Sequence, residues 1–226
     1  MSEALATCAA ELDRLLEAGG HRGIDESTRE RLLAYVHLLA KWNRVWNLTA
    51  VREPSAMLSR HVLDSLSLLP WLDAALEECR GTSTAAEAVD LLDIGSGAGL
   101  PVLPLAICRP TLRCLSVERT EKKARFQRQV VLELGLKRVD VRAERIEDVP
   151  TRAHVVTSRA FTAPEAFLAL AAERLLPRGV ALVMLGRSEF MPDDPGPAWE
   201  SARIEAVSVP GEDADRHIAV CRVRGA

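Results

Sequence analysis

Hydrophobic positions in the first third of the chain recur at helical spacing. Leucines over residues 5–16 predict an amphipathic helix that ends near Gly19. Ser27 and Glu30 have the spacing of a capping box and precede a second apolar stripe. Pro54 suits the first turn of a further helix. The pattern therefore predicts a helical N-terminal region.

The pattern changes to short apolar runs from residue 89 onward. Helical stretches separate the first five runs, which indicates βαβ units and a parallel sheet. Only a short polar connection, 210–213, separates the last two, so we expect these to pair antiparallel. The proline-rich segment 191–197 is predicted to be a loop. The seven predicted strands cover residues 89–94, 112–117, 139–143, 154–158, 179–185, 204–209 and 217–223.

These two patterns predict an α/β fold in two parts. Residues 1–84 form an N-terminal helical extension packed on the core, and the segment 81–84 is typical of a linker. Residues 85–226 form a doubly wound, seven-stranded, Rossmann-like sheet with a final antiparallel strand. A length of 226 residues suits one core of this size with a small appendage.

Composition narrows the class of protein. The chain is 48% hydrophobic and 27% charged, with a net charge of −3, so bulk basicity does not indicate a nucleic-acid partner. Five cysteines without a C-x-x-C pair, and scattered histidines, argue against disulfides and a metal site. No secretory signal or apolar run of the roughly 20 residues needed to cross a bilayer is evident. We therefore expect a cytoplasmic protein with no membrane or metal partner.

A glycine-rich turn follows the first predicted strand. It does not fit the G-x-G-x-x-G spacing of dinucleotide sites or the G-x-x-x-x-G-K-[ST] of phosphate loops. Its G-x-G-x-G spacing, with an acid two residues before the first glycine, resembles motif I of S-adenosylmethionine-dependent methyltransferases. The seven-stranded layout is also that of the common methyltransferase fold. The cofactor-binding residues expected here are Asp93, Gly95, Ser96, Gly97, Gly99 and Leu100.

A second acid supports a nucleoside ligand. Glu118 ends the second predicted strand, where a carboxylate can accept hydrogen bonds from both ribose hydroxyls. An isolated acid at a helix start is more often simply solvated. The strand, the glycine turn and the second acid together favour a cofactor site.

Several short motifs then occur in a specific order. They are KWN through WNLT at 41–49, RH-x-x-DS at 60–65, GSGAGLP at 95–101, RP at 109–110 and SRAF at 158–161. Together they resemble the bacterial glucose-inhibited division protein B family, the 16S ribosomal RNA guanine-N7 methyltransferases (small-subunit methyltransferase G). The resemblance runs from about residue 30 to about residue 185, with a weaker echo at 215–218.

The resemblance implies methyl transfer to N7 of one guanosine, conventionally numbered 527, of 16S ribosomal RNA or the small subunit. We expect the chain to be a monomer. The resemblance also implies cofactor contacts at Gly95, Leu100, Ile146, Glu147 and Arg159. The chain departs from the family pattern at Val102, where glycine is usual, at Leu185–Arg187 and in the segment 191–197. These departures affect the expected substrate side more than the cofactor side.

Basic and aromatic residues supply candidate RNA contacts. Lys123, Arg125 and Arg128 cluster at the start of a predicted helix beside the carboxyl edge of the sheet, and we favour RNA binding over a merely solvated face. His61, three residues before Asp64, is a candidate RNA contact or brace, with a plain helix-surface or interdomain pair as the alternative. Trp42 and Trp46 lie one helical turn apart; they could stack on bases, but we expect them in the core.

Guanine N7 presents a lone pair and no proton, so the predicted reaction needs no general base. Arg159 is expected to orient the reactants, although a strand-end salt bridge is the simpler interpretation. Two other functions stay open. One is a small-molecule methyltransferase whose N-terminal helices cover an apolar pocket. The other is a non-catalytic ribosome-assembly protein, which the intact glycine turn and Glu118 argue against. RNA-dependent methyl release distinguishes the predicted function from both.

Overall fold

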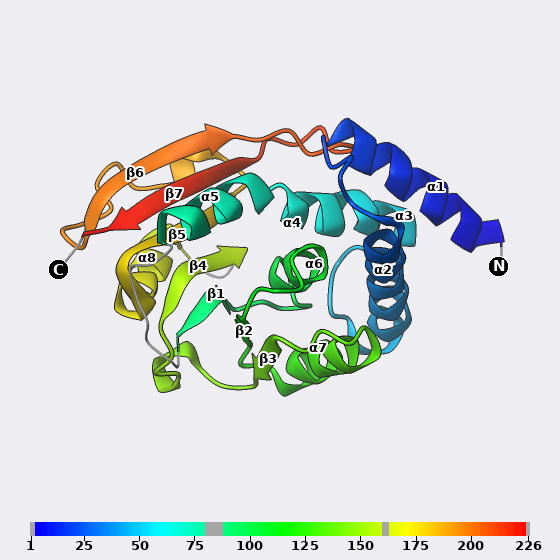
Figure 1. The fold of residues 1–226 in the computed structure, drawn as a ribbon, viewed down its shortest axis with the longest axis horizontal. Helices are drawn as coiled ribbons and strands as arrows, with labels where there is room; N and C mark the ends of the chain where they lie inside the picture. Colours follow the sequence, from blue (N-terminus) through cyan, green and yellow to red (C-terminus); the bar gives the residue numbers. More distant parts are fainter. Residues whose placement is uncertain (1–2, 80–87, 160–162, 225–226) are drawn as a thin grey trace.

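The computed structural model describes residues 3–79, 88–159 and 163–224 (Figure 1). The predicted linker 81–84, the boundary between residues 84 and 85, and the last two residues of the SRAF motif lie outside these ranges. None of the helices in the described ranges is long and apolar enough to cross a membrane.

Helices fill the N-terminal region, as the apolar spacing predicts. They are α1 (Glu3–Ala18), α2 (Glu26–Trp46), α3 (Pro54–Met57), the π-helical turn η1 (Leu58–Leu63), α4 (Asp64–Leu66) and α5 (Leu69–Cys79). The predicted capping box is wrong. Asp25 is the N-cap of α2, and its Oδ1 accepts the N–H of Thr28 at 2.7 Å, which places Ser27 inside the first turn.

The sheet has seven strands in the order β3-β2-β1-β4-β5-β7-β6. Five are parallel, and β7 lies antiparallel between β5 and β6, which confirms the predicted topology. The strands are β1 (Val89–Ile94), β2 (Cys114–Val117), β3 (Val139–Arg142), β4 (Ala153–Arg159), β5 (Leu175–Leu185), β6 (Trp199–Ala206) and β7 (His217–Val223).

The sixth strand differs from its prediction over 204–209. As the edge strand it is mostly exposed and polar, so its apolar pattern is weak. It begins at Trp199 and ends at Ala206. The apolar residues beyond it serve another purpose, because Val209 is buried in the core shared with the N-terminal helices. The predicted loop 191–197 is confirmed, with only Met191 buried within it.

Both faces of the sheet are covered. Alternate residues of β1 point to opposite cores: Leu91 packs with α6 (Val102–Cys108), α7 (Glu121–Glu133) and the N-terminal helices, and Leu92 packs with α8 (Pro164–Arg174). This is the predicted doubly wound arrangement. Short 3₁₀ turns, η2 (Ile146–Asp148) and η3 (Ser188–Phe190), follow β3 and β5.

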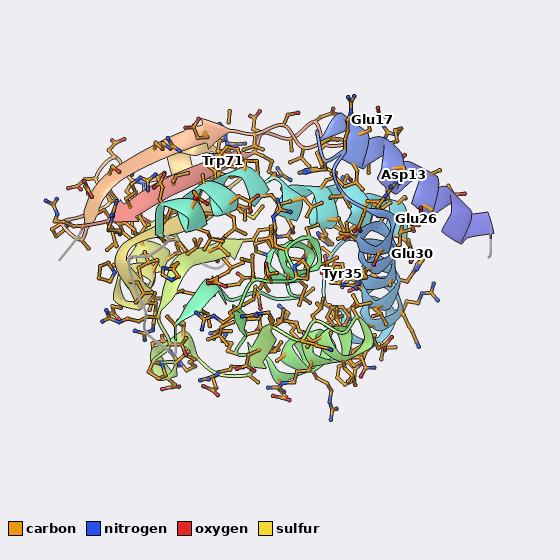
Figure 2. All side chains as sticks on the ribbon, in the orientation of Figure 1. Asp13, Glu17, Glu26, Glu30, Tyr35 and Trp71 are labelled. Atoms are coloured by element: carbon orange, nitrogen blue, oxygen red, sulfur yellow. The ribbon has the colours of Figure 1, made fainter. Side chains whose placement is uncertain are left out.

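The N-terminal extension shares its core with the sheet domain. Tyr35 of α2, labelled in Figure 2, is fully buried, and its hydroxyl donates a hydrogen bond to the carbonyl of Ala98 at 3.0 Å. The same apolar cluster contains Leu12 of α1, Met57 of α3 and Leu103 of α6. The extension therefore rests directly on the glycine turn after β1.

Candidate active site

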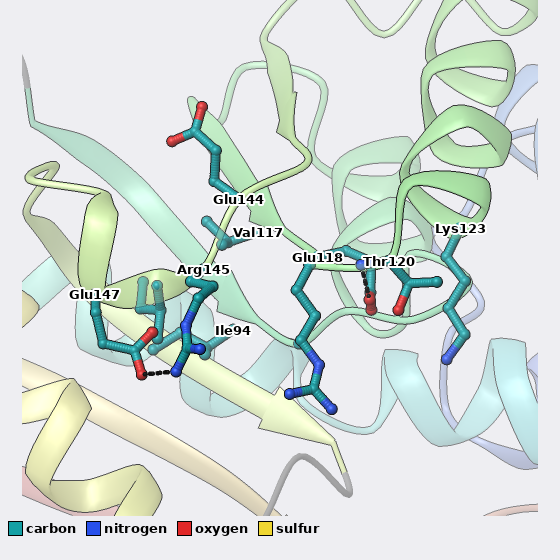
Figure 3. Close-up of a pocket in the computed structure, with 11 residues that line it drawn as sticks. Ile94, Val117, Glu118, Thr120, Lys123, Glu144, Arg145 and Glu147 are labelled. Carbon is teal, nitrogen blue, oxygen red and sulfur yellow. Dashed lines mark hydrogen bonds and ion pairs between the residues drawn. The ribbon is translucent and has the colours of Figure 1, made fainter.

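A cavity of about 350 Å³ opens at the carboxyl ends of β1, β2 and β3 (Figure 3). Four of the predicted cofactor residues line it, together with Lys123 from the first turn of α7. Its walls combine apolar side chains with carboxylates and cations, which suits a ligand with both an apolar ring and polar groups. The lining residues include Ile94, Gly95, Val117, Glu118, Thr120, Lys123, Ile146 and Glu147.

The glycine turn needs its glycines for two different reasons. Gly95, Gly97 and Gly99 all have φ between +58° and +81°, a region that disfavours side chains. A Cβ on Gly99 would lie 2.3 Å from Leu103 Cδ1, so this glycine lets α6 pack. A Cβ on Gly97 would meet nothing within 4 Å. Gly97 therefore leaves open space at the turn, as a ligand requires.

Polar side chains behind the turn hold it in place. Ser96 is buried, and its Oγ lies 2.6 Å from the hydroxyl of Ser116 and accepts a hydrogen bond from the Gln127 amide at 2.8 Å. The same amide donates to the carbonyl of Gly97 at 2.9 Å. Ser96, predicted as a cofactor contact, points into this network. Gln127 is a supporting residue that sequence reasoning missed.

Asp93 lies beneath the turn and is fully buried. Its Oδ2 accepts the N–H of Val102 at 3.2 Å, while Oδ1 has no hydrogen-bond partner in the described parts of the chain. Burial raises the pKa of Asp93 well above its usual value. Val102, which departs from the family pattern, is therefore part of the turn's support, and its side chain is buried in the core.

Glu118 is fixed by two backbone groups. One carboxylate oxygen accepts the N–H of Gly97 and the other accepts the N–H of Thr120, each at 2.8 Å. The side chain is buried but lines the cavity. A carboxylate has about four acceptor positions, so two remain for a ligand.

Ile146 and Glu147 approach the cavity from η2. The guanidinium of Arg174 on α8 anchors this turn by donating to the carbonyl of Ile146 at 3.2 Å. Ile146 is buried, and the exposed Glu147 pairs with Arg145 at 3.3 Å (Figure 3). Leu100, the remaining predicted residue of the turn, is buried in the core and does not line the cavity.

A second polar cluster centres on Asp64, which is 4% exposed. One of its oxygens accepts from Arg159 Nη1 and the other from Arg216 Nε, both at 3.0 Å. Arg159 also donates to the carbonyl of Arg60 at 2.9 Å. Residues from α4, β4 and the segment before β7 thus meet at the carboxyl edge. The salt bridge expected as the simpler interpretation of Arg159 exists, and it joins the N-terminal extension to the sheet.

His61 belongs to this second cluster. Its Nδ1 lies 2.9 Å from the carbonyl of Arg60 and its Nε2 lies 2.8 Å from Thr49 Oγ1. A carbonyl only accepts, so we assign the proton to Nδ1. Burial, and then the Arg159 guanidinium, lower the pKa of His61 to about 4. The His61 imidazole makes no hydrogen bond to the Asp64 carboxylate among the described residues. With its proton on Nδ1, it donates to the same Arg60 carbonyl that accepts from Arg159, and Nδ1 lies 3.3 Å from Arg159 Nη2 without accepting from it.

The predicted basic cluster on α7 is divided. Lys123 lines the cavity, and Arg125 is exposed. Arg128 donates to the carbonyl of Val141 and pairs with Glu121, each at 3.2 Å. Two of the three cations are therefore unpaired among the described residues.

The two tryptophans of α2 do not share the expected burial. Trp42 is half-buried and packs on Phe126 with ring centroids 5.7 Å apart, which agrees with a core position. Trp46 is 38% exposed, so the core prediction is wrong for it. Trp42 packs against the apolar cluster, and Trp46, one helical turn further along α2, lies outside it.

No group of three or more possible metal ligands occurs within the described parts of the chain.

Comparison with known proteins identifies close relatives. A model of the family described as rRNA small subunit methyltransferase G matches residues 28–218. A protein named ribosomal RNA small subunit methyltransferase G from Neisseria meningitidis is 38% identical over 220 residues, covering 94% of this chain and 98% of the relative. A protein of the same name from Methylobacillus flagellatus is 41% identical over 199 residues, covering 86% and 89%.

Solved structures support the fold. A putative O-methyltransferase from Klebsiella pneumoniae superposes with a TM-score of 0.59 at 13% identity, covering 94% of this chain and 96% of that one. The METTL16 methyltransferase domain superposes with a TM-score of 0.55 at 14% identity, covering 86% and 79%. At such identities the likeness concerns the arrangement of helices and strands alone.

Proposed function

Because the chain belongs to the ribosomal RNA small subunit methyltransferase G family, we propose that it methylates N7 of guanosine 527 in 16S ribosomal RNA. The family makes it an S-adenosylmethionine-dependent enzyme. The observation that carries the proposal is the cavity beside Gly97, in which Glu118 is held rigidly by two backbone N–H groups.

The residues around this cavity fit the cofactor. The free acceptor positions of Glu118 suit ribose hydroxyls, and the apolar side chains of Ile94, Val117 and Ile146 suit a purine ring. Oδ1 of the buried Asp93 has no hydrogen-bond partner among the described residues, so this carboxyl keeps an acceptor at the base of the turn. We assign Gly95, Gly97, Glu118, Ile146 and Glu147 to direct contact. Asp93, Ser96, Gly99 and Leu100 keep the turn in shape.

The reaction requires the protein to orient the guanine relative to the methyl group. When bound, S-adenosylmethionine supplies a methyl group on a sulfonium sulfur, which needs no further activation. Guanine N7 offers a lone pair without a proton, so the chain needs no base and its task is alignment. We assign that task to Arg159, held by the Asp64 carboxylate and by the Arg60 carbonyl, which His61 also contacts. An arginine gripping both O6 and N7 would occupy the attacking lone pair, so Arg159 contacts O6, a phosphate or the cofactor.

Lys123 and Arg125 are the proposed phosphate contacts beside the cavity, with Arg128 as a weaker third. His61 is buried, so we assign it to bracing Arg159 and not to direct RNA contact. The enzyme works as a monomer in the cytoplasm on this proposal.

The experiment is methyl transfer from labelled cofactor to naked 16S RNA, to assembled small subunits and to a panel of small molecules. We expect label in RNA only, at one site that becomes cleavable by aniline after borohydride reduction, as 7-methylguanosine is. RNA carrying 7-deazaguanosine at position 527 lacks the reacting nitrogen and is the matched control. Label in that control RNA, or in a small molecule instead of RNA, contradicts the proposal.

A further inference from the structure

Trp46 is an aromatic side chain left exposed at the end of α2. Its ring stacks on Trp42, with centroids 6.3 Å apart and an angle of 29° between the planes. Trp42 in turn contacts the buried Phe126 of α7. Three rings therefore lead from the core to the surface, and the outermost is supported from behind. An indole placed in this way offers a rigid apolar surface.

The position of Trp46 is fixed relative to Arg159. Asn47 ends α2 in a left-handed conformation. The Asn43 side chain accepts the N–H of Thr49 and donates to the carbonyl of Val51, both at 2.9 Å. Thr49 contacts His61, which neighbours Arg159. Trp46 and Thr49 are three residues apart, so their Cα atoms are at most about 11 Å apart. Trp46 is thus three residues along the chain from the contacts that link Thr49, His61 and Arg159.

The charged residues that flank Trp46 along the chain are basic. No acidic residue occurs from His37 to Arg52, whereas Lys41, Arg44 and Arg52 are all exposed. None of these three cations has an ion-pair partner among the residues that the structure describes. Acidic residues lie elsewhere: Asp13 and Glu17 are on α1, and Glu26 and Glu30 are on the first turns of α2 (Figure 2). The end of α2 is therefore positive, while its beginning is mixed.

We propose that Trp46 stacks on an unpaired base of the substrate RNA that flanks the target guanosine. Arg44 and Arg52 contact the adjoining phosphates. An aromatic side chain among unpaired cations matches single-stranded RNA, whose bases stack on aromatic rings while its backbone tracks positive charge. The alternative is a protein partner, which would contact this surface through acidic and apolar side chains. In that case the face of the Trp46 ring that does not pack on Trp42 would contact no base. This inference rests on the proposed RNA substrate.

The test compares the affinity of the full chain for naked 16S RNA across a series of salt concentrations. Trp46→Ala should weaken binding about tenfold or more at every concentration, because stacking releases no counterions and leaves the salt slope unchanged. Trp46→Phe should keep most of the affinity. Arg44→Gln should instead reduce the slope by about one. Leu132→Ala, an exposed apolar side chain on α7 (76% exposed), is the control and should bind like the parent.

Steady-state kinetics distinguish RNA stacking by Trp46 from a role in catalysis or in cofactor binding. The KM for RNA should rise in Trp46→Ala, while kcat at saturating RNA and cofactor affinity stay at parental values. Parental RNA affinity in Trp46→Ala overturns the stacking role even if the parent methylates RNA. A defect seen only with assembled subunits also overturns it and indicates a protein contact. If the parent neither binds nor methylates RNA, the proposed function fails together with this inference.

Discussion

The two halves of the carboxyl edge are built in different ways. Beside β1 and β2, the glycine turn, the ends of these strands and the segment after β3 line the cavity, and backbone N–H groups fix Glu118. Beside β4, side chains from three distant segments meet at Asp64. The cavity half therefore depends on backbone shape, and the Asp64 half depends on charge. Substitutions should affect the halves through different measurable quantities.

The largest effect is expected in the cavity half. Gly97→Val places a branched side chain in the open space at the turn, so we expect S-adenosylmethionine affinity to fall more than 100-fold and methylation to be lost. The helical N-terminal region should stay folded. Titration calorimetry and circular dichroism measure the two quantities.

Gly135→Val is the matched control for that change. Gly135 has φ of +63°, close to the +58° of Gly97, and also has nothing within 4 Å of a built Cβ, but it lies at the end of α7. Both variants bear a similar backbone strain, and only one should lose the cofactor. Equal cofactor binding by a folded Gly97→Val protein and the parent would mean that the ligand does not approach this turn.

In the Asp64 half, Arg159→Lys keeps the charge and loses the planar fork that meets Asp64 and the Arg60 carbonyl. We expect kcat to fall about 10- to 100-fold because the reactants lose their alignment. The pH–rate profile should show no new ionisation near neutrality. Arg109→Lys, which alters a two-bond pair with the exposed Asp73, is the control. A lysine variant with parental turnover would return Arg159 to a structural salt bridge.

The same contrast explains what the sequence could predict. Gly95, Gly97 and Glu118 were predictable because their geometry follows from adjacent residues on neighbouring strands. The partners of Arg159 were not, because Asp64 and Arg60 lie 95 and 99 residues away in sequence, and only packing brings them together. Trp46 was misplaced because helical spacing indicates which residues share a face of the helix but not how far along that face the apolar core extends. The edge strand β6 was shifted because an exposed strand has little apolar pattern.

The basic side chains of α7 beside the cavity are expected to bind RNA. Charge reversal of Lys123, Arg125 and Arg128 to glutamate should lower RNA affinity about tenfold at moderate salt and reduce the salt slope by about two, since Arg128 already pairs with Glu121. Cofactor affinity is measured alongside by titration calorimetry, because Lys123 lines the cavity. Reversal of Lys137, Arg138 and Arg152, exposed residues that precede β3 and β4 at the opposite edge, changes the net charge equally. Equal slopes in the two triple variants would make the α7 face merely solvated.

The smallest expected effect is on the pH dependence of the free energy of unfolding, which has opposite signs for His61 in the Asp64 half and Asp93 in the cavity half. The pKa of His61 is about 4 in the folded chain and about 6.5 when unfolded, so the unfolded state binds more protons between these values. Stability contributed by neutral His61 is therefore lost as the pH falls below about 6.5. Between pH 7 and pH 5.5 the loss should be about 1 kcal/mol, or about 2–4 °C in Tm. Asp93 acts oppositely, because its raised pKa makes folding take up protons as the pH falls.

Urea unfolding at pH 7, 6 and 5.5 measures both signs in matched neutral variants. His61→Gln removes a group that destabilises the fold in acid, so its stability should fall less than the parent's as the pH drops. Asp93→Asn removes a group that favours the fold in acid, so its stability should fall more than the parent's. Because His61 and Asp93 lie in different halves of the edge, the two changes should add in the double variant. Parallel pH profiles for His61→Gln and the parent would show that the imidazole titrates freely, and the brace on Arg159 would then lose its electrostatic basis.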